Sequence, residues 1–174
     1  MKQAKQPTVH NDIRGVLDSI RRIVRALRVA SRAAEKTVGL SGAQVFILQQ
    51  LDGAKPLSVN AIAERTFTHQ SSVSEVVQRL VDKGLVERKQ SAEDGRRQDV
   101  TLTAAGHSSL KKGPHTPQEK LIAALEKMNA KQRQSLAALL QELVDAAGLT
   151  DEKPSLFLED EQKSAKRSSK KSRK

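Results

Sequence analysis

One amphipathic segment that runs straight into two short strands constrains the fold of this chain more than any other feature. Apolar residues recur at helical spacing over 70–83, and Gly84 provides a stop signal for a helix. Two strand patterns follow, over 85–90 and 98–103, and a polar turn over 91–97 separates them. The apolar stripe of the helix must pack on these strands and on a preceding helix; it consists of Val73, Val76, Val77, Leu80 and Val81.

The segments before this unit are predicted to form three helices. The first covers residues 12–36 and carries apolar residues on one face and six arginines on the opposite face. Ser41 and Gln44 form a capping-box pattern that opens the second helix, which ends at Asp52-Gly53. After a short extended link, Ser58 is predicted to cap the third helix.

Helices are also predicted after the strands. Gly113-Pro114 should break the chain after the first of them, and the last should end near Gly148. Their starts are marked by Thr103, by Thr116 with Pro117 and Glu119, and by Asn129 with Gln132. The last helix is expected to turn its leucines inward: Leu136, Leu139, Leu140 and Leu143.

This order of elements predicts a mainly α-helical fold with a small β-wing, an α+β winged helix-turn-helix. We expect one domain over 10–148, in which residues 41–106 form the lobe that would contact DNA. Dimerisation helices are expected at about 10–36 and 117–148, because they present more aliphatic surface than one small wing domain can cover.

The positive charge of the chain is concentrated at its C-terminal end. The formal net charge is +11, from 31 Lys and Arg against 20 Asp and Glu, and residues 163–174 hold seven basic side chains and no acid. Such an excess favours a polyanion partner, although a solvated basic tail without a specific partner explains it equally well. Residues 1–9 and 149–174 are expected to be disordered, the second segment basic from 163.

Composition excludes several classes of function. The chain has no cysteine, which rules out disulfides, thiolate metal sites and thiol redox sensing. It has no Trp or Tyr and only three Phe, so stacking of single-stranded bases on aromatic side chains is not expected. No apolar run reaches the roughly 20 residues of a membrane span, and residues 1–7 lack a signal-peptide pattern. We therefore expect a cytoplasmic protein without a membrane partner.

Patterns typical of catalysis and metal binding are missing from the sequence. The four histidines are scattered without the short spacings of a zinc site: His10, His69, His107 and His115. There is no Gly-rich phosphate loop and no Ser, His and Asp arrangement that pairs a nucleophile with a base. We expect no enzymatic activity, no metal and no cofactor.

The polar face of the helix over 70–83 and the turn over 91–97 carry the functional prediction. The first turn of the helix is small and rich in hydrogen-bonding groups, which can enter a DNA major groove. Arg96 is of the type favoured in narrow minor grooves, and Asp94 can orient it. Taken singly, each feature is also compatible with an ordinary exposed surface. The candidate DNA-binding residues are Ser58, His69, Gln70, Ser71, Ser72, Ser74, Glu75, Gln78, Arg79, Asp94, Arg96 and Arg97.

The stretch from Leu57 to Gly106 resembles the MarR family of transcriptional regulators. The specific part of the shared pattern is Asp94-Gly95-Arg96 followed at a fixed distance by Leu102-Thr103-Ala104-Ala105-Gly106. With the flanking helices, the resemblance covers about residues 10–148. It implies a homodimer, in most cases a repressor, whose first and last two helices intertwine and whose recognition helices read the half-sites of a pseudo-palindromic operator.

The resemblance also assigns roles to single residues. It places the polar residues from Gln70 to Gln78 near the major groove, Arg79 near a phosphate and Arg96 in the minor groove. Glu75 departs from the family's usual basic or neutral residue; we expect it to pair with Arg79, and it could instead accept a hydrogen bond from cytosine N4.

Two further points follow from the resemblance. The break at Gly113-Pro114 puts the spacing of the operator half-sites in doubt, because relatives often have one longer helix there. Many relatives bind small phenolic or other aromatic effectors in a cleft, which here would lie near Phe46 and Arg25.

Two alternatives to a sequence-specific regulator stay open at this stage. One is a nonspecific architectural protein in which the basic tail dominates DNA binding. The other is an interaction module whose helical surface binds another protein. Measuring the binding affinity for operator-containing and for scrambled DNA over a salt series distinguishes these hypotheses.

Overall fold

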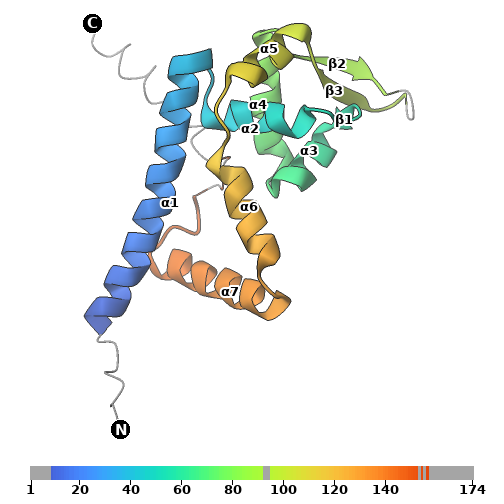
Figure 1. Cartoon of the computed structure of the whole chain (residues 1–174). Coiled ribbons are helices and arrows are strands. Elements are labelled where there is room, and N and C mark those ends of the chain that lie inside the picture. Colours follow the sequence, from blue (N-terminus) through green and yellow to red (C-terminus); the bar gives the residue numbers. More distant parts are fainter. Residues whose placement is uncertain (1–8, 92–94, 153, 155, 157–174) are drawn as a thin grey trace, which may run out of the picture.

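The computed structural model describes residues 9–91, 95–152, 154 and 156. Along the chain, its elements are α1 (Val9–Val38), α2 (Gly42–Leu51), β1 (Leu57–Ser58), α3 (Val59–Thr66), α4 (Gln70–Asp82), β2 (Val86–Gln90), β3 (Gln98–Leu102), α5 (Ala104–Lys112), α6 (Pro117–Lys127) and α7 (Ala130–Ala146). Figure 1 shows α1 along one side of the molecule and the β2–β3 hairpin, the wing, projecting on the other. The mainly helical winged fold predicted from the sequence is confirmed.

The sheet is antiparallel with the strand order β1-β3-β2. Val86 lies opposite Leu102 and Gln90 opposite Gln98, so the two long strands are paired over their full length. The extended link that we predicted before α3 is itself a short strand, because Leu57 and Ser58 pair with β3. This pairing joins the base of the wing to the start of α3.

The hydrophobic core lies in the lobe that comprises α2 to β3, which we call the wing lobe. Its side chains are aliphatic apart from Phe46, which is 1% exposed. We expected Phe46 to lie near an effector cleft; in the structure its side chain is buried in the core, together with its neighbours Val45, Ile47 and Leu48. The other fully buried members include Ile47, Leu48, Ile62, Val73, Val76, Val77, Leu80 and Val100.

Local capping signals account for most helix starts. The capping boxes predicted at Ser41 with Gln44 and at Asn129 with Gln132 are both present, and Ser58 and Thr103 cap α3 and α5. Thr116 is the N-cap residue of α6 and Pro117 follows it, as predicted, but the Thr116 side chain makes no capping hydrogen bond. The Thr116 hydroxyl is buried against α2 and donates to Gln49 Oε1 at 2.7 Å, so a long-range acceptor has replaced the local one.

The structure gives a physical reason for the Leu-Thr-x-x-Gly pattern at 102–106. The Thr103 amide and hydroxyl donate to the carbonyls of Leu85 and Gly84, which fixes the start of α5 against the turn that leads into β2. A Cβ on Gly106 would lie 2.1 Å from the Leu85 carbonyl oxygen, a distance at which the backbone must move. Only glycine allows this approach of α5 to the start of β2.

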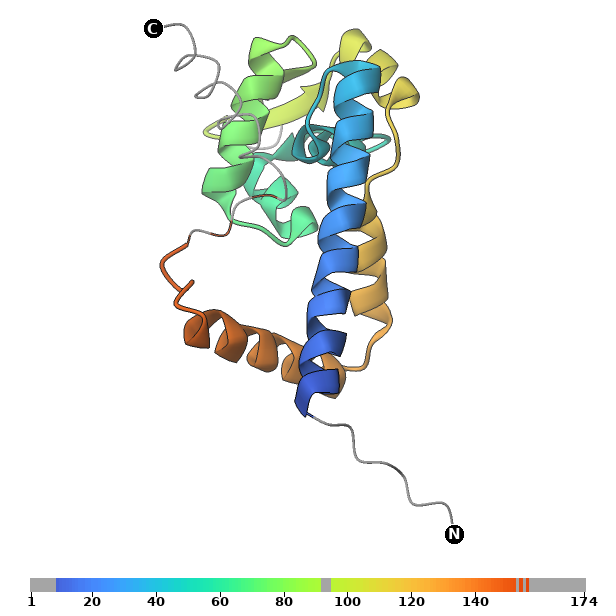
Figure 2. The same cartoon turned by 90° about the vertical axis from the view of Figure 1, so that its left-hand side faces the viewer.

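Helices α1, α6 and α7 form an extended arm at the opposite end of the molecule from the wing (Figures 1 and 2). α1 packs on α2 at its C-terminal end and runs alongside α6. Only Leu27, Ser31 and Ala34 of α1 are buried, and no residue of α7 is buried. Of the leucines of α7 that we expected to point inward, Leu136 is half-buried, and Leu139, Leu140 and Leu143 are exposed, from 44% at Leu143 to 63% at Leu139, because no described residue covers them.

The described residues after α7 include one that is not solvated. Leu156 is 4% exposed and belongs to the core cluster, although it falls in the segment 149–174 that we expected to be disordered. An apolar side chain gains free energy by leaving water, which explains why it packs there. Residues 1–8 and 157–174, including the basic segment, lie outside the described residues. Within the described part, no helix is long and apolar enough to span a bilayer.

Candidate nucleic-acid interface

Helix α4 presents a polar face to solvent because its apolar stripe is buried in the core. Val73, Val76, Val77 and Leu80 are fully buried, so the opposite face cannot turn inward. Of the predicted contact residues on this helix, Gln70, Ser71, Glu75 and Gln78 are exposed, and Ser72, Ser74 and Arg79 are half-buried. The structure therefore leaves Gln70, Ser71, Glu75 and Gln78 accessible on α4.

Two side-chain pairs organise this surface. Arg79 Nη2 lies 3.4 Å from Glu75 Oε2, which confirms the predicted pair one helical turn apart. Gln78 Nε2 donates to Asp82 Oδ1 at 2.9 Å. Sequence reasoning missed Asp82, although its spacing of four residues from Gln78 is the signal that would have found it.

The C-terminal end of α4 is tied to the arm. Lys83 Nζ donates to the Gly39 carbonyl at the end of α1 at 2.8 Å and to Gln44 Oε1 in the capping box of α2 at 3.3 Å. A cation at the carbonyl end of a helix is favourable, so this lysine stabilises the junction of α1 with the wing lobe. This side chain thereby links the end of α4 to the segment between α1 and α2.

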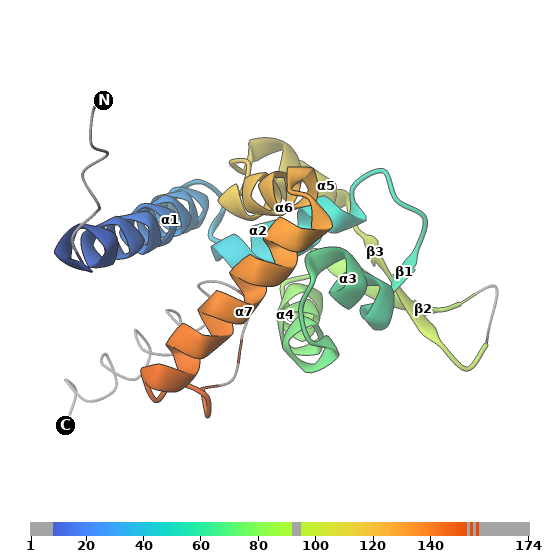
Figure 3. The ribbon, with the colours of Figure 1, turned by 90° about the horizontal axis from the view of Figure 1, so that it is seen from below.

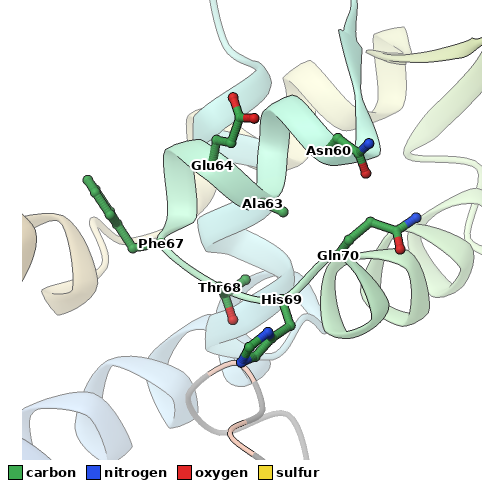
Figure 4. Close-up of a pocket in the computed structure, with 7 residues that line it drawn as sticks. All are labelled: Asn60, Ala63, Glu64, Phe67, Thr68, His69 and Gln70. Carbon is green, nitrogen blue, oxygen red and sulfur yellow. The ribbon is translucent and has the colours of Figure 1, made fainter.

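The turn between α3 and α4 holds an open hollow of about 440 Å³ (Figure 4). His69 is the N-cap residue of α4 and makes no capping hydrogen bond with its side chain. Phe67 has φ of 51° and is 73% exposed, which is an uncommon backbone for a bulky residue and an uncommon place for an aromatic ring. The hollow is lined by Asn60, Ala63, Glu64, Phe67, Thr68, His69 and Gln70.

The wing carries the predicted arginines, but they take different positions. Arg96 is exposed on the hairpin turn, where Gln90 Nε2 donates to the Gly95 carbonyl at 2.6 Å. Arg97 is exposed too, but its Nη2 donates to Ser58 Oγ at 3.0 Å. Asp94, expected to orient Arg96, lies outside the described residues.

Ser58 is not accessible to a ligand, because its side chain is hydrogen-bonded within the protein. Its side chain is buried, and its hydroxyl accepts hydrogen bonds from the Ala61 amide and from Arg97. The capping serine and the second wing arginine thus connect the base of the wing to α3. Sequence spacing could not reveal this contact, because the two residues are 39 positions apart.

Figure 3, which views the molecule from below, shows the wing and α1 at opposite ends, with α3 and α4 between them. An exposed polar helix and an exposed hairpin arginine on one lobe can contact adjacent grooves of a duplex. Among the described residues, no group of three His, Asp or Glu side chains is placed to hold a metal ion.

The comparisons with known proteins agree with this geometry. Residues 38–97 match the model of the MarR family. The chain is 30% identical over 130 residues to an uncharacterized HTH-type transcriptional regulator of Mycobacterium leprae, a match that covers 73% of this chain and 88% of that protein. It is 26% identical over 122 residues to the HTH-type transcriptional repressor Rv2887 of Mycobacterium tuberculosis, covering 70% and 88%.

A solved structure shows the same fold. The transcriptional regulator BldR from Sulfolobus solfataricus superposes with a TM-score of 0.52 at 22% identity, over 80% of this chain and 99% of that one. The sequence matches include the helix-turn-helix and the start of the wing, where the polar face of α4 and the exposed arginine are found. The chain belongs to the MarR family of winged helix-turn-helix transcriptional regulators.

Proposed function

We propose that this protein is a homodimeric, sequence-specific repressor that binds a pseudo-palindromic operator in double-stranded DNA. The observation that carries the proposal is the exposed polar face of α4 beside a wing whose turn arginine, Arg96, is also exposed. In this proposal α4 enters the major groove, and Arg96 contacts the neighbouring minor groove. Ser58 and Arg97 hold the wing in position instead of touching DNA.

The exposed apolar faces of the arm support the homodimer. Ile13, Val16, Leu17, Ile20 and Ile23 lie on one face of α1 and are between 37% and 55% exposed. α7 adds a second row of exposed leucines. An amphipathic helix gains most of its stability by burying its apolar face, and a second copy of the chain provides such a face. Two-fold symmetry would place two copies of α4 on half-sites about one helical turn apart.

Release of DNA by a small molecule is a further part of the proposal. Thr116 and Gln118, at the start of α6, are buried, and Gln118 Oε1 accepts no hydrogen bond within the described part of the chain. The hydroxyl group of a phenol could donate to this oxygen. A panel of phenols should contain a compound that raises the melting temperature and weakens DNA binding, and Gln118→Leu should abolish both effects.

The test of DNA recognition uses the full chain and duplexes selected from a randomised pool. Arg96→Ala should weaken binding to the selected duplex by about 1–3 kcal/mol, because a minor-groove arginine contact is lost. Arg22→Ala, on the exposed side of α1, is the matched control and should leave the affinity nearly unchanged. Equal affinities for Arg96→Ala and the unaltered protein would remove the wing from the mechanism.

The same assay distinguishes the nonspecific architectural alternative. Deletion of residues 163–174 should weaken binding to selected and scrambled duplexes equally, and the selected duplex should survive competitor DNA. Binding that shows no preference and disappears with added salt or with this deletion would favour an architectural protein. Absence of binding at low salt would favour a protein-interaction module.

A further inference from the structure

The exposed face of α4 carries two carboxylates and one arginine. Glu75 and Asp82 lie on this face with one arginine, Arg79, so the face is net negative. A carboxylate near phosphates costs free energy through like-charge repulsion. Glu75 is compensated by Arg79, whereas Asp82 is engaged by the neutral amide of Gln78. The role of Asp82 therefore lies in what it does to Gln78.

The hydrogen bond from Gln78 to Asp82 sets the direction of the amide. An ionised carboxylate only accepts hydrogen bonds, so the amide nitrogen must face it and the amide oxygen must face away. A rotation by half a turn would put the Gln78 oxygen against the Asp82 carboxylate, which is repulsive. A glutamine without such a neighbour presents either its donor or its acceptor and reads bases less selectively.

We propose that Asp82 is a positioning residue that makes Gln78 a selective reader of bases with an exocyclic amino group in the major groove. This inference rests on the proposed function. The outward amide oxygen accepts from adenine N6 or cytosine N4. Guanine and thymine present the O6 and O4 acceptors at the same place, and an oxygen facing them is repelled. Glu75, three residues earlier on the same face, is also an acceptor and favours the same two bases.

The experiment selects duplexes from a pool with 20 randomised base pairs, using the full chain and five variants. Asp82→Asn keeps the shape of the side chain, but asparagine can both donate and accept hydrogen bonds. The Gln78 amide can therefore take either orientation beside it. Asp82→Glu keeps the carboxylate. Gln78→Ala removes the amide that would contact the base, and the double variant Gln78→Ala with Asp82→Asn completes a double-mutant cycle. Asp145→Asn is the matched control, because Gln141 Nε2 donates to Asp145 Oδ1 at the same 2.9 Å on α7, in the arm.

The expected result is a loss of selectivity at one base pair of each half-site. The unaltered protein should prefer adenine or cytosine there by about tenfold, the value of one good base contact. Asp82→Asn should reduce this preference to about twofold or less, Asp82→Glu should restore most of it, and Asp145→Asn should not change it. In the Gln78→Ala background, Asp82→Asn should have no further effect on base preference.

Other outcomes overturn the inference in distinguishable ways. If Asp82→Asn raises affinity equally for all sequences and keeps the base preference, Asp82 acts only through its charge and this inference fails alone. If the affected base pair prefers guanine or thymine, the assigned direction of the amide is wrong. If the unaltered protein enriches no sequence, the proposed function fails and this inference fails with it.

Discussion

The wing lobe and the arm differ in how completely a single chain buries their apolar side chains. In the wing lobe, α2, α3, α4 and the sheet enclose a core in which residues such as Ile47, Val73 and Val100 have no exposed surface. In the arm, α7 buries no residue, and most of the apolar face of α1 stays exposed. The wing lobe thus buries its apolar side chains within one chain, whereas the apolar face of the arm is not covered by the described residues.

The hydrogen bonds of Lys83 connect these two regions. This side chain holds the end of α4 against the end of α1, so a change in the direction of α1 would be transmitted to the helix with the polar face. In the proposed homodimer, the contacts of the arm would therefore set the separation and orientation of the two copies of α4 on DNA.

The largest effect on the difference between the two regions is expected from a charge placed in the apolar face of the arm. Ile20→Glu puts a carboxylate in the apolar stripe of α1 and, by symmetry, twice in the dimer. Burial of an unpaired carboxylate costs several kcal/mol and the proposed dimer would contain two, so dimerisation should weaken by more than about 3 kcal/mol. Sedimentation equilibrium measures the effect. Val29→Glu is the control, since Val29 is 58% exposed and lies on the opposite face of α1. Equal dimerisation of both variants would place the interface elsewhere.

The same glycine substitution should have opposite effects in the two regions. Gly106→Ala in the wing lobe forces a Cβ against the Leu85 carbonyl and should lower the free energy of unfolding by about 3 kcal/mol. Gly15→Ala in α1 meets nothing within 4 Å and should raise it by about 0.5–1 kcal/mol, because alanine favours a helix. Denaturant titrations give both values. A tolerated Gly106→Ala would mean that α5 can shift freely from β2.

A smaller loss is expected where the wing joins the lobe. Ser58→Ala removes the cap of α3 and the acceptor of Arg97, and should cost about 1–2 kcal/mol of stability. Ser108→Ala, at an exposed position of α5, is the control and should change stability by only a few tenths of a kcal/mol. Comparable melting temperatures for the two variants would show that Ser58 does not hold the wing.

The smallest effect is a gain in the wing lobe. Phe67→Gly should stabilise the protein by about 1 kcal/mol, because a left-handed backbone is strained for a side chain and the exposed ring buries little. Phe67→Ala keeps the Cβ and should bring no such gain. Thermal unfolding distinguishes them. If Phe67→Gly is instead less stable, the ring makes a stabilising contact that outweighs its backbone strain.

Much of the candidate interface followed from short-range patterns. The helix over 70–83 and the hairpin after it were predicted closely, and the Glu75–Arg79 pair was expected from its spacing. The capping boxes at Ser41 and Asn129 formed as predicted, because a capping side chain and its target amide are only three residues apart. Such contacts depend on few dihedral angles and little on the rest of the chain.

What the amino-acid sequence determined by itself was therefore the set of elements, their caps and the polar face of α4. Only the tertiary structure decided that the Thr116 hydroxyl donates to Gln49, 67 residues away, and that Arg97 donates to Ser58 at the base of the wing. It also decided that Phe67 takes a left-handed backbone and that Leu156 joins the core. The physical reason is that each of these positions is selected by partners brought close only when the whole chain packs, and no local pattern contains that information.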